Sequence, residues 1–443
     1  MMNNNNTKVL EGSVLNVFLS FSIPTVLGML AVTSAGIIDG MFVGNYVGAE
    51  ALAAISLCSP IYSLLFGLPI LFSVGGEVFC GKFIGEGKLE KARIIFTNIF
   101  VIIAVISFIL TFLGLFFIEE IADFLGADHT IKPLVVTYLY IIISMSPVLS
   151  CYALTYFTRV DGKPNLSFIS LLLVALINTI LDYVFIVQLN WGVKGAALGT
   201  SLSYFVLPIL LIPPFIKGNG NLKFRFKKLE WKMLSAISYN GSSEFLSELS
   251  GGFLFYLINL QMIKYYGNEG VAAYAIVGYL MYFMIMLSYG MSDALKSIVS
   301  VNFGAQLMDR VKRFLKIALV TAVVLGGCLA LTTTLFVDQF IDLFLENDSP
   351  STKVLTSQFI LSSAPIVVIL GVNILLSAFF TSLHHPKPSL IISLLRTLIL
   401  PVGLILLLTH FYGGEGIINA IVLSEVFTLC VSGFLYWKHL RRL

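Results

Sequence analysis

The sequence predicts an all-α integral membrane protein of twelve transmembrane helices, arranged as two six-helix lobes with a cavity between them. Three observations carry this prediction: the composition, a series of apolar segments, and an internal repeat. Of the 443 residues, 58% are hydrophobic and 12% are charged, which is unusual for a soluble protein of this length. Twelve apolar segments have about the 20 residues needed to cross a bilayer. They cover residues 16–39, 50–74, 94–118, 133–157, 165–189, 194–217, 234–264, 270–292, 313–337, 354–380, 388–410 and 414–437.

The basic residues indicate the orientation of these spans. If the N-terminus lies inside, the segments on the cytoplasmic side hold 22 of the 27 Lys and Arg residues. This excess predicts that both termini are cytoplasmic. The polar start of the chain lacks the apolar core of a cleavable signal peptide, so we expect the first span to be the targeting signal.

An internal repeat indicates that the two halves arose by duplication. WGVKGAALGTSLS at 191–203 aligns with YGGEGIINAIVLS at 412–424, and Lys-Pro pairs begin at Lys163 and Lys387. Because six spans is an even number, the halves share one topology, and we expect a pseudo-two-fold axis along the membrane normal. The predicted parts are an N-lobe (1–217), a basic cytoplasmic linker (218–233) and a C-lobe (234–443).

Two aspartates lie where a charge is costly. Asp39 follows the apolar stretch 23–38, and Asp182 lies in the fifth span with Asn178 one helical turn before it. A carboxylate at membrane depth is a functional hypothesis by default, although a helix end at the interface is the simpler alternative for each. Spans 1 and 5 run in the same direction, so the two aspartates can face each other and titrate as a coupled unit. Such a site suits a proton, or a sodium ion with amide and hydroxyl oxygens as further ligands.

Pro24 is a candidate hinge in the first span. A proline inside a helix removes one backbone hydrogen bond and clashes with the carbonyl one turn back, here that of Ser20. About four turns, roughly 23 Å, separate Pro24 from Asp39. Protonation of the Asp39 cluster is expected to change the bend of the span, and the alternative is a static kink with no gating role.

The combination of these features resembles the multidrug and toxic compound extrusion (MATE) transporters, most closely their prokaryotic DinF-like branch. The resemblance rests on the six-plus-six spans, on Pro24 fifteen residues before Asp39 in SIPTVLGMLAVTSAGIIDGMFVG, on NTILD in the fifth span, and on the Lys-Pro loops. It covers essentially the whole chain. It implies an antiporter of the bacterial cytoplasmic (inner) membrane that expels lipophilic organic cations through a V-shaped central cleft.

The resemblance also implies which residues couple transport to a cation. They are Asp39, Asn178 and Asp182, and Thr200 in GTSLS resembles another member of that polar cluster. Either Thr155 or Tyr138 corresponds to the polar position of the fourth span.

The second lobe carries further charges within its spans. Glu244 and Glu248 lie one turn apart on one face of span 7. For Glu248, three roles are open: direct cation coupling, substrate contact or internal pairing. Arg396 and Glu425 lie at similar depths, and we expect them to form a structural salt bridge because an unpaired charge there is expensive.

Two acids mark the cytoplasmic ends of spans. Glu77 and Asp293 are expected to be solvated caps at the ends of spans 2 and 8, where both are also candidates for a cytoplasmic gate.

Three other functions are less consistent with the sequence. A lipid-linked oligosaccharide flippase of the same superfamily is expected to line its cleft with several basic residues, whereas Arg396 alone is expected deep in a span. The loop 81–93 lacks the Gly-x-x-x-Asp-Arg signature of the major facilitators. A membrane enzyme needs a catalytic grouping, a phosphate loop or metal-ligand spacing, and the sequence suggests none.

These exclusions define the expected partners. We expect an organic cation as substrate, a coupling cation and membrane lipid, with no nucleic acid and no cofactor, in a monomeric protein. The substrate-binding residues are unknown. The only metal expected is a sodium ion at Asp39, Asn178 and Asp182. The cysteines are expected to be small core residues: Cys58, Cys80, Cys151, Cys328 and Cys430.

Overall fold

The computed structural model describes residues 4–345 and 350–440, in which all regular structure is helical. The first half contains α1 (Asn4–Glu11), α2 (Val14–Tyr46), α3 (Ala49–Leu57), α4 (Ser59–Gly85), α5 (Leu89–Phe116), α6 (Ile118–Phe124), α7 (Lys132–Ser144), α8 (Ser146–Leu149), the 3-10 helix η1 (Ser150–Ala153), α9 (Leu154–Val160), α10 (Pro164–Asp182), the π-helix η2 (Tyr183–Gln188), α11 (Gly192–Ser203) and α12 (Val206–Lys217). The second half contains α13 (Trp231–Gly304), α14 (Met308–Leu335), α15 (Val337–Leu345), α16 (Pro350–Ser382), α17 (Pro386–Leu394), the π-helix η3 (Leu395–Ile399), α18 (Leu400–Tyr412) and α19 (Glu415–Leu440).

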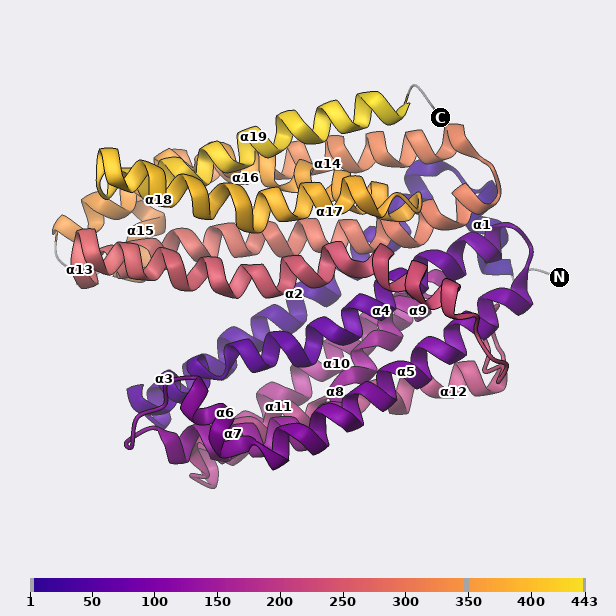
Figure 1. Cartoon of the computed structure of the whole chain (residues 1–443). Coiled ribbons are helices and arrows are strands. Elements are labelled where there is room, and N and C mark those ends of the chain that lie inside the picture. The colour runs from indigo at the N-terminus through magenta and orange to yellow at the C-terminus, as the bar shows by residue number, and fades with distance from the viewer. Residues whose placement is uncertain (1–3, 346–349, 441–443) are drawn as a thin grey trace.

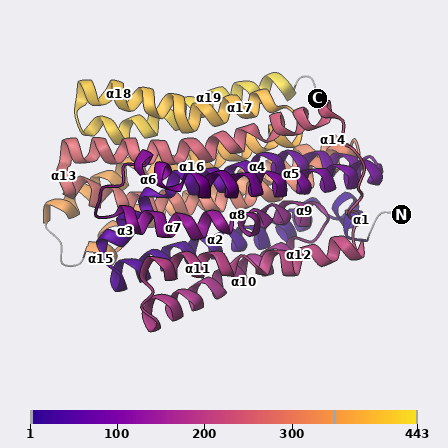
Figure 2. The same cartoon turned by 60° about the horizontal axis from the view of Figure 1, so that its bottom comes forward.

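The helices form two lobes. In Figure 1, α2 to α12 make one lobe and α13 to α19 the other, and the lobes diverge from the end of the molecule where both termini lie. Figure 2 shows the long helices of both lobes running along a common direction. This arrangement confirms the predicted all-α, two-lobe fold.

The predicted spans correspond to helices of the structure, and the twelve-helix arrangement is consistent with it. Ten helical segments of the described chain are long and apolar enough to cross a membrane, and α7 with α8–α9 forms an eleventh that is bent by 55° near Met145. The predicted seventh span corresponds to the first half of α13, residues 231–266, which is also helical. It turns back at Gly267, whose φ of 62° and ψ of −152° interrupt the helix.

The predicted second span had the wrong limits. Span 2 was expected at 50–74, but the chain first forms the short α3, and α4 runs from Ser59 to Gly85. Pro60 in the first turn starts this second helix, because proline is favoured at a helix N-terminus. Apolar composition does not reveal such a break, since both helices are hydrophobic.

The sequence repeat corresponds to repeated backbone geometry. Gly192 and Gly413 both have positive φ, 56° and 60°. Gly192 is the first residue of α11, and Gly413 lies in the turn that precedes α19. Three residues later, a Cβ at Gly195 or Gly416 would lie 3.0 Å or 2.5 Å from a backbone carbon of the preceding helix. The glycines are therefore needed for a tight helical hairpin in each lobe.

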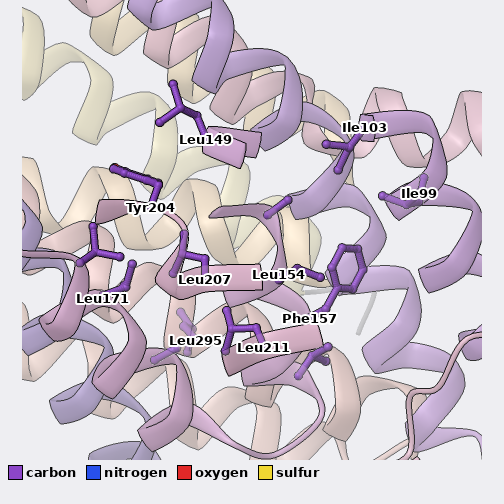
Figure 3. Close-up of a cluster of buried hydrophobic side chains, with 14 of the residues drawn as sticks. Ile99, Ile103, Leu149, Leu154, Phe157, Leu171, Tyr204, Leu207, Leu211 and Leu295 are labelled. Carbon is purple, nitrogen blue, oxygen red and sulfur yellow. The ribbon is translucent and has the colours of Figure 1, made fainter. Parts of the chain in front are cut away.

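Apolar side chains fill the interior of the N-lobe. Figure 3 shows Leu154 and Phe157 of α9 close to Leu207 and Leu211 of α12, and all four are buried. This packing fixes α9, which carries Arg159 at the boundary between the lobes.

Glycines bring the two lobes into backbone contact near the termini. A Cβ at Gly75 would lie 2.0 Å from the carbonyl oxygen of Ile237, and one at Gly85 would lie 2.0 Å from that of Val301. Helix α4 of the N-lobe therefore packs directly against both halves of α13. Such small-residue contacts are typical of close helix packing in membranes.

The segment between α12 and α13 is held on the N-lobe. The carboxylate of Asp161 accepts hydrogen bonds from the backbone N–H groups of Asn221 and Leu222, at 2.7 and 2.9 Å. Arg93 donates from Nε to the carbonyl oxygen of Asn221 at 2.8 Å. These bonds fix the course of the basic segment across the ends of α5 and α9.

Candidate functional site

A cavity of about 660 Å³ lies between the lobes. Its wall is rich in aromatic, methionine and small polar side chains, and charged groups occupy both sides. The N-lobe contributes Met29, Thr33, Asp39, Tyr62, Phe66, Tyr138, Tyr152, Tyr156, Asn178, Thr200 and Tyr204, among others; the C-lobe contributes Glu244, Glu248, Tyr282, Met286, Tyr289, Asp293 and Lys296. A polarizable wall of this kind suits apolar cations.

The structure brings Asp39 and Asp182 together at the N-lobe wall. Their carboxyl groups are in side-chain contact, although 143 positions separate them in the sequence. Asp182 is fully buried, and neither of its oxygens receives a hydrogen bond from a donor in the described chain. The buried Oδ1 of Asp39 also has no donor. Two ionised carboxylates in contact repel each other, so such a pair is suited to holding a proton or another cation.

Neighbouring polar groups complete this cluster. Asn178 is buried, lies beside Asp182 and lines the cavity, and its Nδ2 has no acceptor among the described residues. Thr200 lines the cavity as well. Of the two fourth-span candidates, Tyr138 lines the cavity, whereas the Thr155 hydroxyl donates to the carbonyl of Tyr152 at 2.7 Å.

Helix geometry explains why Asp39 and Asp182 are not helix ends facing solvent. Helix α2 continues for two turns beyond Asp39, to Tyr46. At Asp182, α10 changes into the π-helix η2. A π-helical turn inserts an additional residue and is frequent at functional sites.

Gly199 is a site residue that the sequence argument did not identify. A Cβ at this position would lie 2.1 Å from Asp182 Oδ1. The carboxyl group therefore rests on the backbone of α11. The available signal was the position of Gly199 next to Thr200 in the repeat segment.

Pro24 lies inside α2, which continues through it as one helix. Thr25 donates from Oγ1 to the carbonyl of Phe21 at 2.7 Å. Pro24 itself does not line the cavity, which begins at Met29 one turn later.

The predicted acids of span 7 have different environments. Glu244 forms an ion pair with Lys296, with Oε1 to Nζ at 3.0 Å. Glu248 lies exposed in the cavity wall. The two therefore share a helix face but only Glu244 has a fixed cationic partner in the described structure.

The predicted Arg396–Glu425 salt bridge is wrong. Both side chains are buried, but Arg396 donates from Nη2 to the Tyr289 hydroxyl at 3.2 Å. Glu425 accepts from Nδ2 of Asn373 at 2.7 Å. Equal depth in two spans does not fix which faces of the helices meet, and polar neighbours on other helices satisfy both groups.

The predicted solvation of Glu77 and Asp293 is also wrong. Helices α4 and α13 continue for two to three turns past them, and both side chains are buried. Asp293 pairs with Arg159 and Lys296, at 2.9 and 2.8 Å. Glu77 accepts a hydrogen bond from the Ser297 hydroxyl.

Arg396 is consequently not the only basic residue deep in the molecule. Arg159 and Lys296 are both fully buried. A usable signal was present for Lys296, because it lies three residues after Asp293 inside an apolar helix, the spacing of a helical ion pair. Both cations are neutralised by acids, so they do not make the cavity basic.

The cysteines are not uniformly core residues as expected. Cys58 and Cys80 are buried, whereas Cys328 and Cys430 are exposed. No group of three or more His, Cys, Asp or Glu side chains in the described chain has the arrangement of a metal site.

The sequence also matches a known protein family. The model of the family described as MatE matches the chain twice, over residues 24–184 and 247–406. The chain belongs to the MATE family. The two matches correspond to the two lobes, and because the family is one of transporters, the membrane-enzyme alternative is excluded.

Curated relatives and solved structures agree with the family. The chain is 27% identical to the multidrug export protein MepA of Staphylococcus haemolyticus, covering 98% of this chain and 95% of the relative. It is also 27% identical, with the same coverage, to MepA of Staphylococcus aureus strain NCTC 8325. A solved structure, described as the outward-facing conformation of a multidrug resistance MATE family transporter of the MOP superfamily, matches with a TM-score of 0.91. That match covers 100% of this chain and 98% of the other at 22% identity.

Proposed function

We propose that this MATE protein is a secondary active multidrug efflux antiporter, which exports lipophilic organic cations in exchange for protons by alternating access. The observation that carries the proposal is the contact of Asp39 with Asp182 at the wall of the cavity between the lobes. The name of the MepA relatives, multidrug export protein, supports drug export.

The proposed coupling step uses the N-lobe cluster. A proton from outside binds between Asp39 and Asp182, and the organic cation then leaves the cavity because the cluster has lost negative charge. Asn178 and Thr200 supply an amide and a hydroxyl beside the carboxyl groups. With a sodium ion in place of the proton, the same oxygens are its ligands.

Pro24 is proposed to let α2 bend during this cycle. The helix lacks the backbone hydrogen bond that an N–H at position 24 would donate to Ser20. A bend there moves the wall that carries Met29, Thr33 and Asp39 relative to the rest of the lobe. The protein is further proposed to be a monomer in the bacterial inner membrane with both termini in the cytoplasm, as the charge distribution of the loops predicts.

The flippase alternative is disfavoured by the charge of the cavity. The basic residue in its described lining, Lys296, is bound by Asp293 and Glu244. Arg159, which lies behind the wall, is bound by Asp293. The carboxyl groups of Asp39 and Glu248 have no cationic partner among the described residues, so the cavity favours a cation over a pyrophosphate.

Efflux from proteoliposomes tests the proposal. Ethidium is loaded inside, and a proton gradient or a sodium gradient is imposed in separate samples. Efflux driven by protons alone supports the proposal, whereas a requirement for sodium assigns the cluster to sodium. Efflux that needs neither gradient contradicts antiport.

A further inference from the structure

A buried cluster of charges crosses the boundary between the lobes at the base of the cavity. Arg159 of α9 donates from Nη2 to Oδ2 of Asp293 on α13 at 2.9 Å. Ser297, one turn after Asp293, donates across the same boundary to Glu77 of α4. The side chains of Arg159 and Asp293 are only 1% and 3% exposed, so this is an ion pair without solvent.

The position of the cluster makes it part of the seal between the lobes. It lies between the cavity, which Asp293 and Lys296 line, and the glycine contacts near the termini. There, a Cβ at Gly81 would lie 2.0 Å from the Ser300 hydroxyl, and one at Gly304 would lie 2.0 Å from the carbonyl of Lys82. The lobes are thus closed on the side of the termini, and any opening there must separate Arg159 from Asp293.

Separating a buried ion pair is expensive if either charge is left alone. In this cluster, neither Arg159 nor Asp293 would be left without an opposite charge. Glu77 lies within electrostatic range of Arg159 on the same lobe, and its Oε2 has no hydrogen-bond donor in the described chain. Asp293 keeps Lys296 at 2.8 Å on its own helix, and Lys296 also keeps Glu244.

We infer that Glu77, Arg159, Asp293 and Lys296 form an exchangeable gate: Arg159 binds Asp293 when the terminal side is closed and Glu77 when it opens, while Asp293 stays with Lys296. The cluster divides into one oppositely charged pair per lobe. The lobes part without stranding a buried charge, so both states are accessible. The inference rests on the proposed alternating access and adds the residues that control it.

The exchange predicts opposite effects from two substitutions that each replace a carboxylate with an amide of the same length. Asp293→Asn removes the partner that Arg159 has in the closed state, so the population open at the terminal side should rise by roughly tenfold. Glu77→Gln removes the partner that Arg159 needs in the open state, so the same population should fall. The Gln carbonyl still accepts from Ser297, so the hydroxyl contact of the closed state is kept.

Double electron–electron resonance distances measure these populations without requiring transport. The five native cysteines are replaced, and spin labels are attached to cysteines at Lys88, after α4, and Lys387, at the start of α17. Asp123→Asn is the control, because Asp123 pairs with Lys132 within the N-lobe and away from the boundary.

Shifts in opposite directions, with no shift in the control, support the gate. Shifts in the same direction, or none, overturn it. If Asp293→Asn does not fold, Ser297→Ala replaces it and should raise the open population by a smaller factor; no rise would also overturn the gate. Opposite shifts in a protein that does not export ethidium would retain the gate and reject drug export.

Discussion

Asp182 Oδ1 rests against the Cα of Gly199, where an added methyl group would lie only 2.1 Å from it. This contact leaves no space for a side chain between α10 and α11. The same carboxyl group is in contact with Asp39. The geometry of the proposed coupling cluster therefore depends on a residue that has no side chain of its own.

Gly199→Ala is expected to reduce proton-driven ethidium efflux by at least about tenfold, because the new methyl group displaces Asp182 from Asp39. Overpacking of a tight site typically costs roughly 1–3 kcal/mol. Efflux is measured in proteoliposomes. Gly251→Ala is the matched control, since nothing lies within 4 Å of a Cβ at Gly251. Equal efflux in both variants would show that the position of Asp182 is not critical.

Asp182→Asn is expected to abolish proton-driven efflux while the protein still folds and inserts. The amide keeps the shape of the carboxyl group, but it does not bind and release a proton in the pH range in which a carboxyl group does. Size-exclusion chromatography checks folding, and ethidium efflux checks coupling. Efflux at the wild-type rate would reject a coupling role for Asp182.

Pro24→Ala is expected to stabilise α2 and slow transport. The substitution supplies the N–H that the carbonyl of Ser20 lacks, which in a helix interior is worth up to about 3 kcal/mol. Thermal unfolding and efflux rate are measured together. Pro69→Ala, which removes a proline inside α4, controls for the general effect. A stabilised protein that transports at the normal rate would mean that the proline has no gating role.

Asp161→Asn is expected to loosen the segment between α12 and α13. The buried carboxylate accepts from two backbone N–H groups and from Lys163 Nζ at 2.8 Å, and loss of its charge should cost roughly 1–3 kcal/mol. Limited trypsin digestion should then cleave this segment faster than in the wild type. Glu90→Gln serves as the comparison, because Glu90 pairs with Arg93 and Arg225 on the surface. Unchanged cleavage would mean that Asp161 does not anchor the segment.

His384 is expected to make stability sensitive to acid. It lies in the turn between α16 and α17, with its ring 4.4 Å from that of Phe79 and 5.9 Å from that of Phe303. Burial, followed by the charges of Lys82 and His385, lowers the pKa of His384 to about 3. The unfolded chain therefore binds a proton below about pH 6.5 that the folded protein does not, and stability falls as the pH drops toward 3.

The loss should be at most about 1.4 kcal/mol for each pH unit below 6.5. His384→Asn should remove it, and Asn tolerates the positive φ of 59° at this position. Thermal unfolding at pH 7 and pH 5 measures the difference, with His385→Asn as the neighbouring control. An identical pH dependence in the His384→Asn variant would contradict this role.

The sequence by itself determined the membrane class, the helical two-lobe fold, the duplication and the family. Each depends on local or periodic properties: apolar length, the distribution of basic residues, and short segments such as WGVKGAALGTSLS and NTILD. It also singled out Asp39 and Asp182, because an acid inside an apolar segment is visible without knowledge of its neighbours.

The tertiary structure decided which buried charges are partners. Arg396 binds Tyr289 and not Glu425, Glu77 accepts from Ser297, and Arg159 binds Asp293 across the two lobes. Hydropathy gives the depth of a residue in the membrane but not the direction in which its helix face points. Only the packing of α4, α9 and α13 sets that direction, and it places the cluster of opposite charges between the lobes.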